Sequence, residues 1–176
     1  MMITKSSQTW SNDTINCTTR LLSKNVKIID NVLPQDEFDS IVNAFLKERS
    51  LPWFIEENVS GMGIEDHCYF THNIKVTIKE LFPLGEILQS KIFYRIKANL
   101  YPRTHEVYHH KDHVDGDFPH RGAILYLNTN NGFTVVNGTP VESVANRLLL
   151  FDPQIPHHST TCSDQQYRAN INFNFK

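Results

Sequence analysis

The sequence contains little cysteine, and its cysteines are poorly arranged for cross-linking. Among 176 residues there are three, Cys17, Cys68 and Cys162, widely separated and odd in number. This excludes a disulfide framework and lacks the paired spacing of a zinc ribbon. We therefore expect a protein of a reducing compartment, the cytoplasm.

An excess of charge of either sign is also absent, as are long apolar runs. Seventeen Lys and Arg residues oppose 19 Asp and Glu residues, for a net charge of -2. A nucleic-acid-binding surface usually needs a strongly basic patch, so we expect no nucleic-acid partner. No apolar run approaches the roughly 20 residues that span a bilayer, and the first twenty residues lack the apolar centre of a signal peptide. We expect no membrane partner.

The length suits one folded domain behind a short polar arm. Residues 1–24 are rich in Ser, Thr and Asn, which predicts a loose arm or a peripheral strand, and residues 25–176 are expected to form the domain. Residues 26–30 ("VKIID") predict a short strand. Pro34 and the apolar spacing of residues 38–46 predict a helix that packs against a sheet.

The rest of the helical part, about 34–90, is less regular. Residues 51–77 contain Trp53, Phe54, Glu56 and Glu57 followed by two glycines, so we expect a mobile segment beside a sheet, a candidate lid. Residues 77–91 resemble a second helix, with a break expected near Pro83 and Gly85.

After residue 90 the chain becomes rich in short β-like segments separated by Asn, Gly, Pro and Asp. These segments are "KIFYRIKANLY", "HRGAILYLNT", "GFTVV", "TPVESV", "NRLLLF", "HHSTT" and "YRANINFNF". Such spacing predicts an antiparallel sandwich or barrel. The fold class is therefore α+β, mainly β, with a jelly-roll core over about 91–176 and amino-terminal helices packed on one sheet.

Residues 109–117, "HHKDHVDGD", form the densest cluster of candidate metal ligands. The pattern histidine–any–aspartate occurs twice, at His110/Asp112 and His113/Asp115. Residues i and i+2 of a strand share a face, so either pair could present a nitrogen and an oxygen ligand together. The cluster is also compatible with a solvated turn, and the residues alone leave both pairs open.

A third ligand is available downstream, in "FDPQIPHHSTT". His157 or His158 stands at the start of a strand that could close a site from across the barrel. Two histidines and one carboxylate on one face leave coordination positions open, as in non-haem Fe(II) oxygenases.

The last strand adds a polar face. Arg168, Asn170, Asn172 and Asn174 share one face, while Ala169, Ile171, Phe173 and Phe175 share the other. An interior face of this kind is costly to bury unless a polar ligand lies on it. A dicarboxylate bound by the guanidinium group would offset that cost.

The segment from about Tyr94 to Phe175 resembles the Fe(II)/2-oxoglutarate-dependent dioxygenases, particularly the prolyl-4-hydroxylase-like branch with its small phage-encoded members. The resemblance lies in "NLYPRTHEVYHHKDHVD", "AILYLNTNNG", "VANRLLLFDPQIPHHSTTCSD" and "RANINFNF", in the order of that branch. It implies a double-stranded β-helix core, and a cytoplasmic location in a bacterial or phage-infected cell.

Carried over residue by residue, the resemblance implies that His113, Asp115 and His157 are the catalytic metal ligands. Tyr101-Pro102 precedes His113 by about the number of residues usual in the family. The resemblance therefore implies that His110 and Asp112 are not ligands. His157 is favoured over His158 by its spacing to Arg168. The resemblance further implies that Arg168, Tyr126 and Tyr101 bind 2-oxoglutarate.

The implied activity is hydroxylation of an aliphatic C–H bond, with a prolyl residue of a peptide or protein as a candidate, coupled to conversion of 2-oxoglutarate to succinate and CO2. The implied cofactors are Fe(II) and 2-oxoglutarate as cosubstrate, with ascorbate as an accessory ligand. The partner would be a peptide, protein or small molecule; Arg103 and Arg121 are candidate substrate contacts or ordinary surface charges. The alternatives are a cupin-like jelly-roll metalloprotein and a non-catalytic binding module.

Overall fold

A computed structural model describes residues 3–5, 8–10, 13–15, 17–57, 59, 67–75 and 78–176. The helical segments are α1 (Gln35–Val42), the π-helical turn η1 (Asn43–Lys47), the 3-10 turn η2 (Lys79–Leu81) and α2 (Phe82–Ile87). The amino-terminal strands are β1 (Ile3–Lys5), β2 (Gln8–Trp10), β3 (Asp13–Ile15), β4 (Thr18–Ser23), β5 (Val26–Asp30), β6 (Phe54–Glu56) and β7 (Tyr69–Asn73). The later strands are β8 (Phe93–Pro102), β9 (Arg121–Tyr126), β10 (Phe133–Val136), β11 (Thr139–Glu142), β12 (Arg147–Phe151), β13 (His157–Ser159) and β14 (Tyr167–Phe175).

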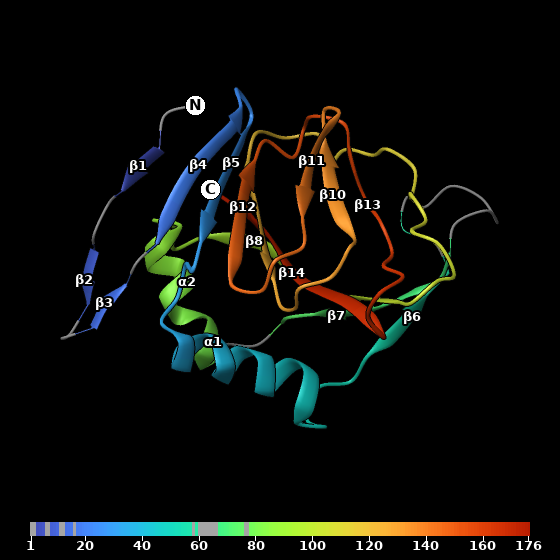
Figure 1. The fold of residues 1–176 in the computed structure, drawn as a ribbon, viewed down its shortest axis with the longest axis horizontal. Helices are drawn as coiled ribbons and strands as arrows, with labels where there is room; N and C mark the ends of the chain where they lie inside the picture. The colour runs from blue at the N-terminus through green and yellow to red at the C-terminus, as the bar shows by residue number, and fades with distance from the viewer. Residues whose placement is uncertain are drawn as a thin grey trace.

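The strands form two facing antiparallel sheets (Figure 1). The larger sheet has nine strands in the order β1-β4-β5-β12-β9-β14-β8-β7-β6, and the smaller has the order β11-β10-β13. A hairpin of β2 and β3 stands apart from both. The seven strands expected after residue 90 are all present, and the mainly β jelly-roll architecture is confirmed.

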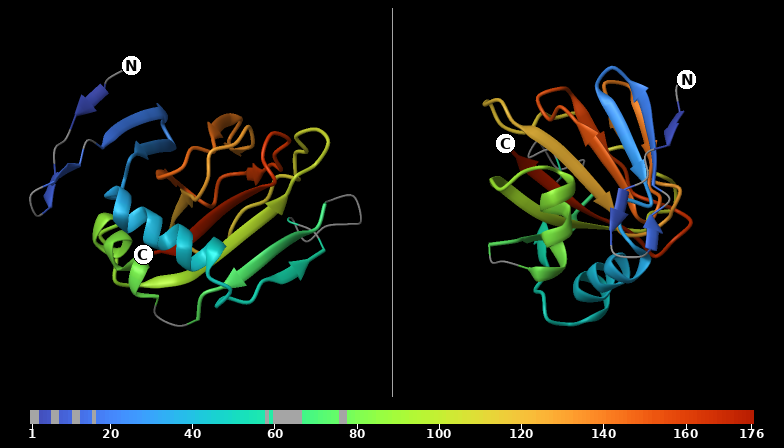
Figure 2. Two further views of the ribbon diagram at one scale, coloured as in Figure 1. Left: turned by 60° about the horizontal axis from the view of Figure 1, so that its bottom comes forward. Right: turned by 90° about the vertical axis from the view of Figure 1, so that its left-hand side faces the viewer.

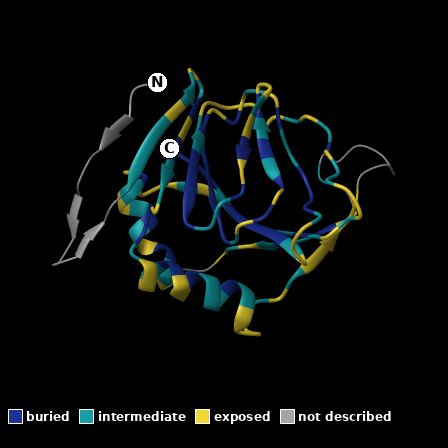
Figure 3. Cartoon of the chain, viewed as in Figure 1, coloured by how far each residue is buried: buried dark blue, intermediate teal, exposed yellow. Residues whose placement is uncertain are grey.

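Alternating side chains of the large sheet build two cores. On β12, Leu148 packs towards the helices and Leu149 towards the small sheet. On β9, Leu125 and Ile124 divide in the same way. Figure 3 shows the resulting run of buried residues along β12 and β14. Strands buried on both faces explain why the carboxy-terminal half reads as short apolar runs.

The helices cover the outer face of the large sheet, as the sequence predicts (Figure 2). Phe38 and Ile41 of α1, Phe45 of η1 and Leu84 of α2 all join the core that contains Ile171 and Phe173 of β14. Asn146, which precedes β12, secures the approach to α1: it accepts a bond from the Leu33 amide (3.1 Å) and donates one to the Leu33 carbonyl oxygen (2.8 Å).

The expected break of the second helix near Pro83 and Gly85 is wrong. Helix α2 begins at Phe82 and runs through both residues to Ile87. Pro83 lies in the first turn, where a missing amide proton costs no hydrogen bond. A break would be expected only where the proline removed an intrahelical bond.

The segment expected to be irregular contains two strands. Residues 54–56 and 69–73 form β6 and β7, which extend the large sheet beyond β8. Gly61 and Gly63 of the candidate lid lie outside the described residues, so the lid remains a prediction. The division between an arm over 1–24 and a domain from 25 also remains a prediction, although β4 is hydrogen-bonded to β5. Within the described part of the chain, no helix is long and apolar enough to cross a bilayer.

Candidate metal centre

Backbone pairing brings the two halves of the site together. His113 and His157 exchange both backbone hydrogen bonds, at 2.9 and 3.0 Å, and the Asp115 amide donates to the Pro153 carbonyl oxygen at 2.8 Å. His113 and His157 thus form an isolated β-bridge, and the extended segment that follows it carries Asp115 back beside the chain that leads into β13. Gly116, with a φ of 68°, then turns the chain away.

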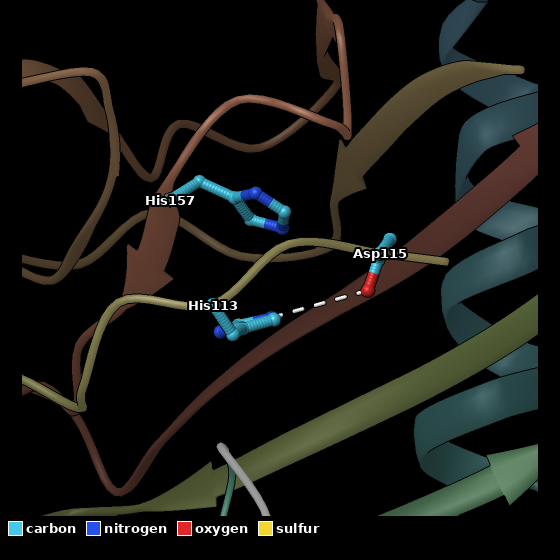
Figure 4. A group of neighbouring side chains, drawn as sticks. All are labelled: His113, Asp115 and His157. Carbon is cyan, nitrogen blue, oxygen red and sulfur yellow. Dashed lines mark ion pairs between the residues drawn. The ribbon is translucent and has the colours of Figure 1, made fainter. Parts of the chain in front are cut away.

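The structure brings His113, Asp115 and His157 into one cluster (Figure 4). One potential ligand atom from each lies within 4.8 Å of the other two. His113 Nε2 is 4.0 Å from Asp115 Oδ1, and the two imidazole rings have centroids 4.5 Å apart. Side chains that converge in this way from two segments could share one metal ion.

The remaining atoms of the three side chains are held by hydrogen bonds that leave the converging atoms free. His157 Nδ1 donates to the Ile155 carbonyl oxygen at 2.8 Å, and His113 Nδ1 makes a longer contact of 3.5 Å with the Lys111 carbonyl oxygen. A ring nitrogen that donates carries the proton, so Nε2 has a free lone pair. This is the usual outer support of a metal-binding histidine.

Electrostatics place the three groups in the protonation states that a metal requires. Burial lowers the pKa of both His113 and His157, which favours the neutral imidazole. Burial alone would raise the pKa of Asp115, but the Arg95 guanidinium and the Asn174 carboxamide bring it down to about 2. Two neutral imidazoles and one carboxylate fit a divalent transition metal such as Fe(II).

Arg95 is a functional candidate that the sequence alone did not reveal. Its Nη2 donates to Asp115 Oδ2 at 2.8 Å, and its Nε donates to Asn174 Oδ1 at 3.2 Å. Asn174 and Asn172 also donate to Asp115 Oδ2, at 3.1 and 3.4 Å. One carboxylate oxygen is thus held by the protein, which leaves Oδ1 to face the histidines.

Replacing Arg95 with methionine is expected to weaken metal binding about 10- to 100-fold, the usual cost of removing an outer partner of a ligand. The physical reason is that Asp115 loses the cation that fixes its orientation and its charge. Titration with Co(II), followed by visible absorption, measures the affinity without any turnover. Arg95→Lys should recover part of the loss, whereas equal affinities for wild type and Arg95→Met would contradict the assignment.

The structure also separates the two histidine–any–aspartate pairs. His158 Nδ1 lies 2.6 Å from Asp112 Oδ1, and His158 Nε2 lies 3.1 Å from His109 Nδ1. Both ring nitrogens of His158 are therefore engaged away from the cluster. His110 is buried against the rings of Tyr101 and Tyr108. Neither His110 nor Asp112 belongs to the group formed by His113, Asp115 and His157.

Arg168 is enclosed at the far end of the polar face of β14. The side chain is fully buried and donates to Ser143 Oγ at 2.7 Å, Thr134 Oγ1 at 2.8 Å and the Thr160 carbonyl oxygen at 3.3 Å. Its guanidinium carbon lies 5.3 and 5.6 Å from the ring centroids of Tyr101 and Tyr126. The three residues predicted to bind 2-oxoglutarate are thus neighbours.

Gly132 makes room for this arginine. A Cβ atom at Gly132 would lie 2.7 Å from Arg168 Cδ and would also collide with the Thr161 carbonyl oxygen. In the sequence this glycine is only the last residue of the segment "AILYLNTNNG". Its packing role became visible only when β14 was placed beside it.

A pocket joins the metal cluster to this region. Its lining includes the three clustered residues, Arg95, Lys97, Tyr101, Thr134 and the asparagines at 99, 170 and 172. Tyr126 and Arg168 do not line the pocket; both donate to Thr134 Oγ1, at 2.9 and 2.8 Å. Arg103 and Arg121 also lie outside the lining. Arg121 instead donates to the backbone oxygens of Leu88 and Lys176.

No protein-family model matches this chain, and no curated protein matches it by sequence. Solved structures do match its fold. A viral collagen prolyl hydroxylase from Paramecium bursaria Chlorella virus-1, in complex with 2-oxoglutarate, aligns with a TM-score of 0.58 at 14% identity, covering 86% of this chain and 95% of that one.

Two further structures extend this likeness. The prolyl hydroxylase of Trichoplax adhaerens, bound to a peptide of hypoxia inducible factor, aligns with a TM-score of 0.59 at 15% identity over 87% of this chain and 84% of that one. HygX from Streptomyces hygroscopicus, with nickel, 2-oxoglutarate and hygromycin B bound, gives 0.60 at 10% identity over 86% and 82%. The chain has the fold of the 2-oxoglutarate- and Fe(II)-dependent oxygenases.

Proposed function

We propose that this protein is an Fe(II)- and 2-oxoglutarate-dependent dioxygenase that hydroxylates an aliphatic C–H bond and releases succinate and CO2. The observation that carries the proposal is the convergence of two imidazoles and one carboxylate, within 4.8 Å, on one side of a polar pocket. This donor set binds Fe(II) through one face and leaves positions open for cosubstrate and dioxygen.

In this assignment His113 and His157 offer Nε2, and Asp115 offers Oδ1. When bound, the iron supplies dioxygen activation coupled to oxidative decarboxylation of the 2-oxo acid. The protein holds the ligands in place: the Ile155 carbonyl oxygen orients the His157 ring, and Arg95 and Asn174 hold the second oxygen of Asp115. Partial burial of the three ligands limits access of bulk water to them.

Thr134 connects Arg168 to the pocket. Its Oγ1 accepts hydrogen bonds from both Arg168 Nη2 and Tyr126 OH. A hydroxyl group has two acceptor sites and one donor, so the Thr134 proton is left to point elsewhere. Because Thr134 lines the pocket, that proton is suited to the distal carboxylate of 2-oxoglutarate, with the charge of Arg168 behind it. The Tyr101 side chain, which also lines the pocket, flanks the same position.

A prolyl residue of a peptide is the candidate substrate that the sequence resemblance favours. Among proteins of the same fold, one structure holds a peptide and another holds hygromycin B, so the fold accepts both peptides and small molecules. Ascorbate would act as an accessory ligand of the same centre.

The proposal is tested by anaerobic titration of the purified protein with Fe(II) and 2-oxoglutarate. The expected result is the weak visible charge-transfer band of the iron–2-oxo acid chelate. Admission of oxygen should then produce succinate. A protein that binds metal but gives no band would be a jelly-roll metalloprotein of another kind, and a protein that binds no metal would be a non-catalytic module; either outcome rejects the proposal.

A further inference from the structure

A lysine stands inside the pocket and has no role in the chemistry described above. Lys97 lies on β8, paired in register with Asn172 of β14, and it lines the pocket together with the three proposed metal ligands. Its Nζ is 3.2 Å from Tyr69 OH and 5.5 Å from the centroid of the Tyr69 ring. The ammonium group is therefore held at the metal end of the pocket.

Lys97 makes no ion pair with any carboxylate in the described part of the chain. The two nearby carboxylates have other partners. Asp115 forms an ion pair with Arg95 at 2.8 Å, and Glu56, on the exposed strand β6, accepts a hydrogen bond from Thr71 at 3.3 Å. Burial, with Arg95 as a second cause, lowers the pKa of Lys97 to about 8. Lys97 is only partly buried, but a cation that has lost part of its hydration and has no counter-ion is still costly, and a bound anion would offset that cost.

The charge balance of a site that holds Fe(II) and 2-oxoglutarate also favours an anionic ligand. Fe(II) carries two positive charges and 2-oxoglutarate two negative ones, which leaves Asp115 against two cations that line the pocket, Arg95 and Lys97, and a third, Arg168, behind Thr134. The pocket would keep an excess of positive charge after both cofactors had bound. An anionic substrate would reduce this excess, whereas a cationic one would increase it.

The neighbours of Lys97 define the rest of the ligand. Asn99 Oδ1 and Asn172 Oδ1 are buried acceptors with no hydrogen-bond partner among the described residues. Their amide nitrogens are already used: Asn99 Nδ2 donates to Asn170 Oδ1 at 3.0 Å, and Asn172 Nδ2 contacts Asp115 Oδ2 at 3.4 Å. One cation without an ion pair, beside two acceptors without a hydrogen-bond partner, suits an acid that carries its own N–H or O–H donors; this group has too few donors for a phosphate dianion.

We propose that Lys97 binds a carboxylate of the substrate, so that the substrate is a carboxylic acid with an amino, amide N–H or hydroxyl group beside the acid. This deepens the proposed function and rests on it. The other available carboxylate is that of 2-oxoglutarate. Arg168 and Lys97 are four residues apart in register along β14 and β8, about 13 Å. The distal carboxylate of a cosubstrate anchored near Arg168 would therefore lie well away from Lys97 along the strands.

The test compares acids with their amides on protein loaded with Zn(II) and 2-oxoglutarate, which cannot turn over. The panel contains the common L-amino acids, free and N-acetylated, each as the acid and as the primary amide. We expect at least one acid to raise the Tm of the wild type while its amide does not. Lys97→Met should abolish that shift, Lys97→Arg should retain part of it, and the matched control Lys27→Met, at an exposed lysine of β5, should leave it unchanged.

A second arm separates the two sources of carboxylate. The dissociation constant of 2-oxoglutarate, measured from the Fe(II) charge-transfer band, is expected to change less than about threefold in Lys97→Met. A large loss there would assign Lys97 to the cosubstrate and overturn the proposal. Amides as effective as acids, an undiminished shift in Lys97→Met, or no acid-dependent shift would also overturn it. The wild-type band reports on the proposed function separately.

Discussion

Replacing His157 with alanine is expected to abolish the charge-transfer band that Fe(II) and 2-oxoglutarate give with the wild-type protein. His157 is the only member of the cluster that reaches it from β13, so its removal leaves two ligands on one short segment. Because a facial site needs all three ligands, the affinity for Fe(II) should fall by at least about 100-fold, and turnover should fall with it. Anaerobic titration followed by visible absorption measures both ligand loss and affinity.

His158→Ala provides the matched control at the adjacent position. Both ring nitrogens of His158 are engaged by Asp112 and His109, so this variant should keep the band and the iron affinity. Circular dichroism of the two variants would show that neither change unfolds the chain. Retention of the band in His157→Ala, or its loss in His158→Ala, would reverse the assignment of the distal ligand.

Replacing Arg168 with methionine is expected to cost stability as well as cosubstrate affinity. The fully buried guanidinium satisfies Ser143, Thr134 and the Thr160 carbonyl oxygen, and methionine can satisfy none of them. Leaving buried hydrogen-bonding groups without a partner costs about 1–3 kcal/mol of the free energy of unfolding. Loss of the charge behind Thr134 should weaken 2-oxoglutarate binding by about tenfold or more, the scale of one charge-assisted hydrogen bond.

Urea denaturation measures the loss of stability, and the charge-transfer titration measures the loss of affinity for 2-oxoglutarate. Arg168→Lys separates them: it keeps a positive charge but cannot reproduce the three-way bonding, so it should lose stability and retain part of the affinity. A variant as stable as the wild type, with unchanged affinity for 2-oxoglutarate, would show that Arg168 neither organises nor serves the pocket.

The alternating pattern of β14 explains why so much of this site was visible in the sequence. Arg168, Asn170, Asn172 and Asn174 were predicted to share a face. In the structure Asn170 and Asn172 of that face line the pocket, while Ile171 and Phe173 enter the helix-covered core. Successive side chains of a strand point to opposite faces whichever strands lie beside it, so this alternation can be predicted from the sequence of the strand alone. The helix over residues 35–42 could be predicted for the same reason, because its apolar spacing is also a local pattern.

The role of Arg95 could not be predicted from any local sequence pattern. In the sequence it was one of several scattered basic residues. Its role depends on the register that sets Arg95 opposite Asn174, 79 residues away, and on the loop that carries Asp115 over both. The failed expectation at Pro83 and Gly85 has a related cause, because a helix start and a helix break look alike until the packing of Leu84 decides between them.

The sequence by itself determined the strand order along the chain, the two-faced character of β14 and the short list of histidines and aspartates from which ligands could come. The residues alone left His157 or His158, and His113/Asp115 or His110/Asp112, open, and the resemblance favoured His113, Asp115 and His157. The tertiary structure brings these three together and holds His158 against Asp112 and His109, because the backbone pairing of residues 113 and 157 sets which imidazoles face each other. It also placed Lys97 in the pocket and set Arg168 behind Thr134. These are long-range contacts, and their partners are fixed by the folding of two sheets onto each other.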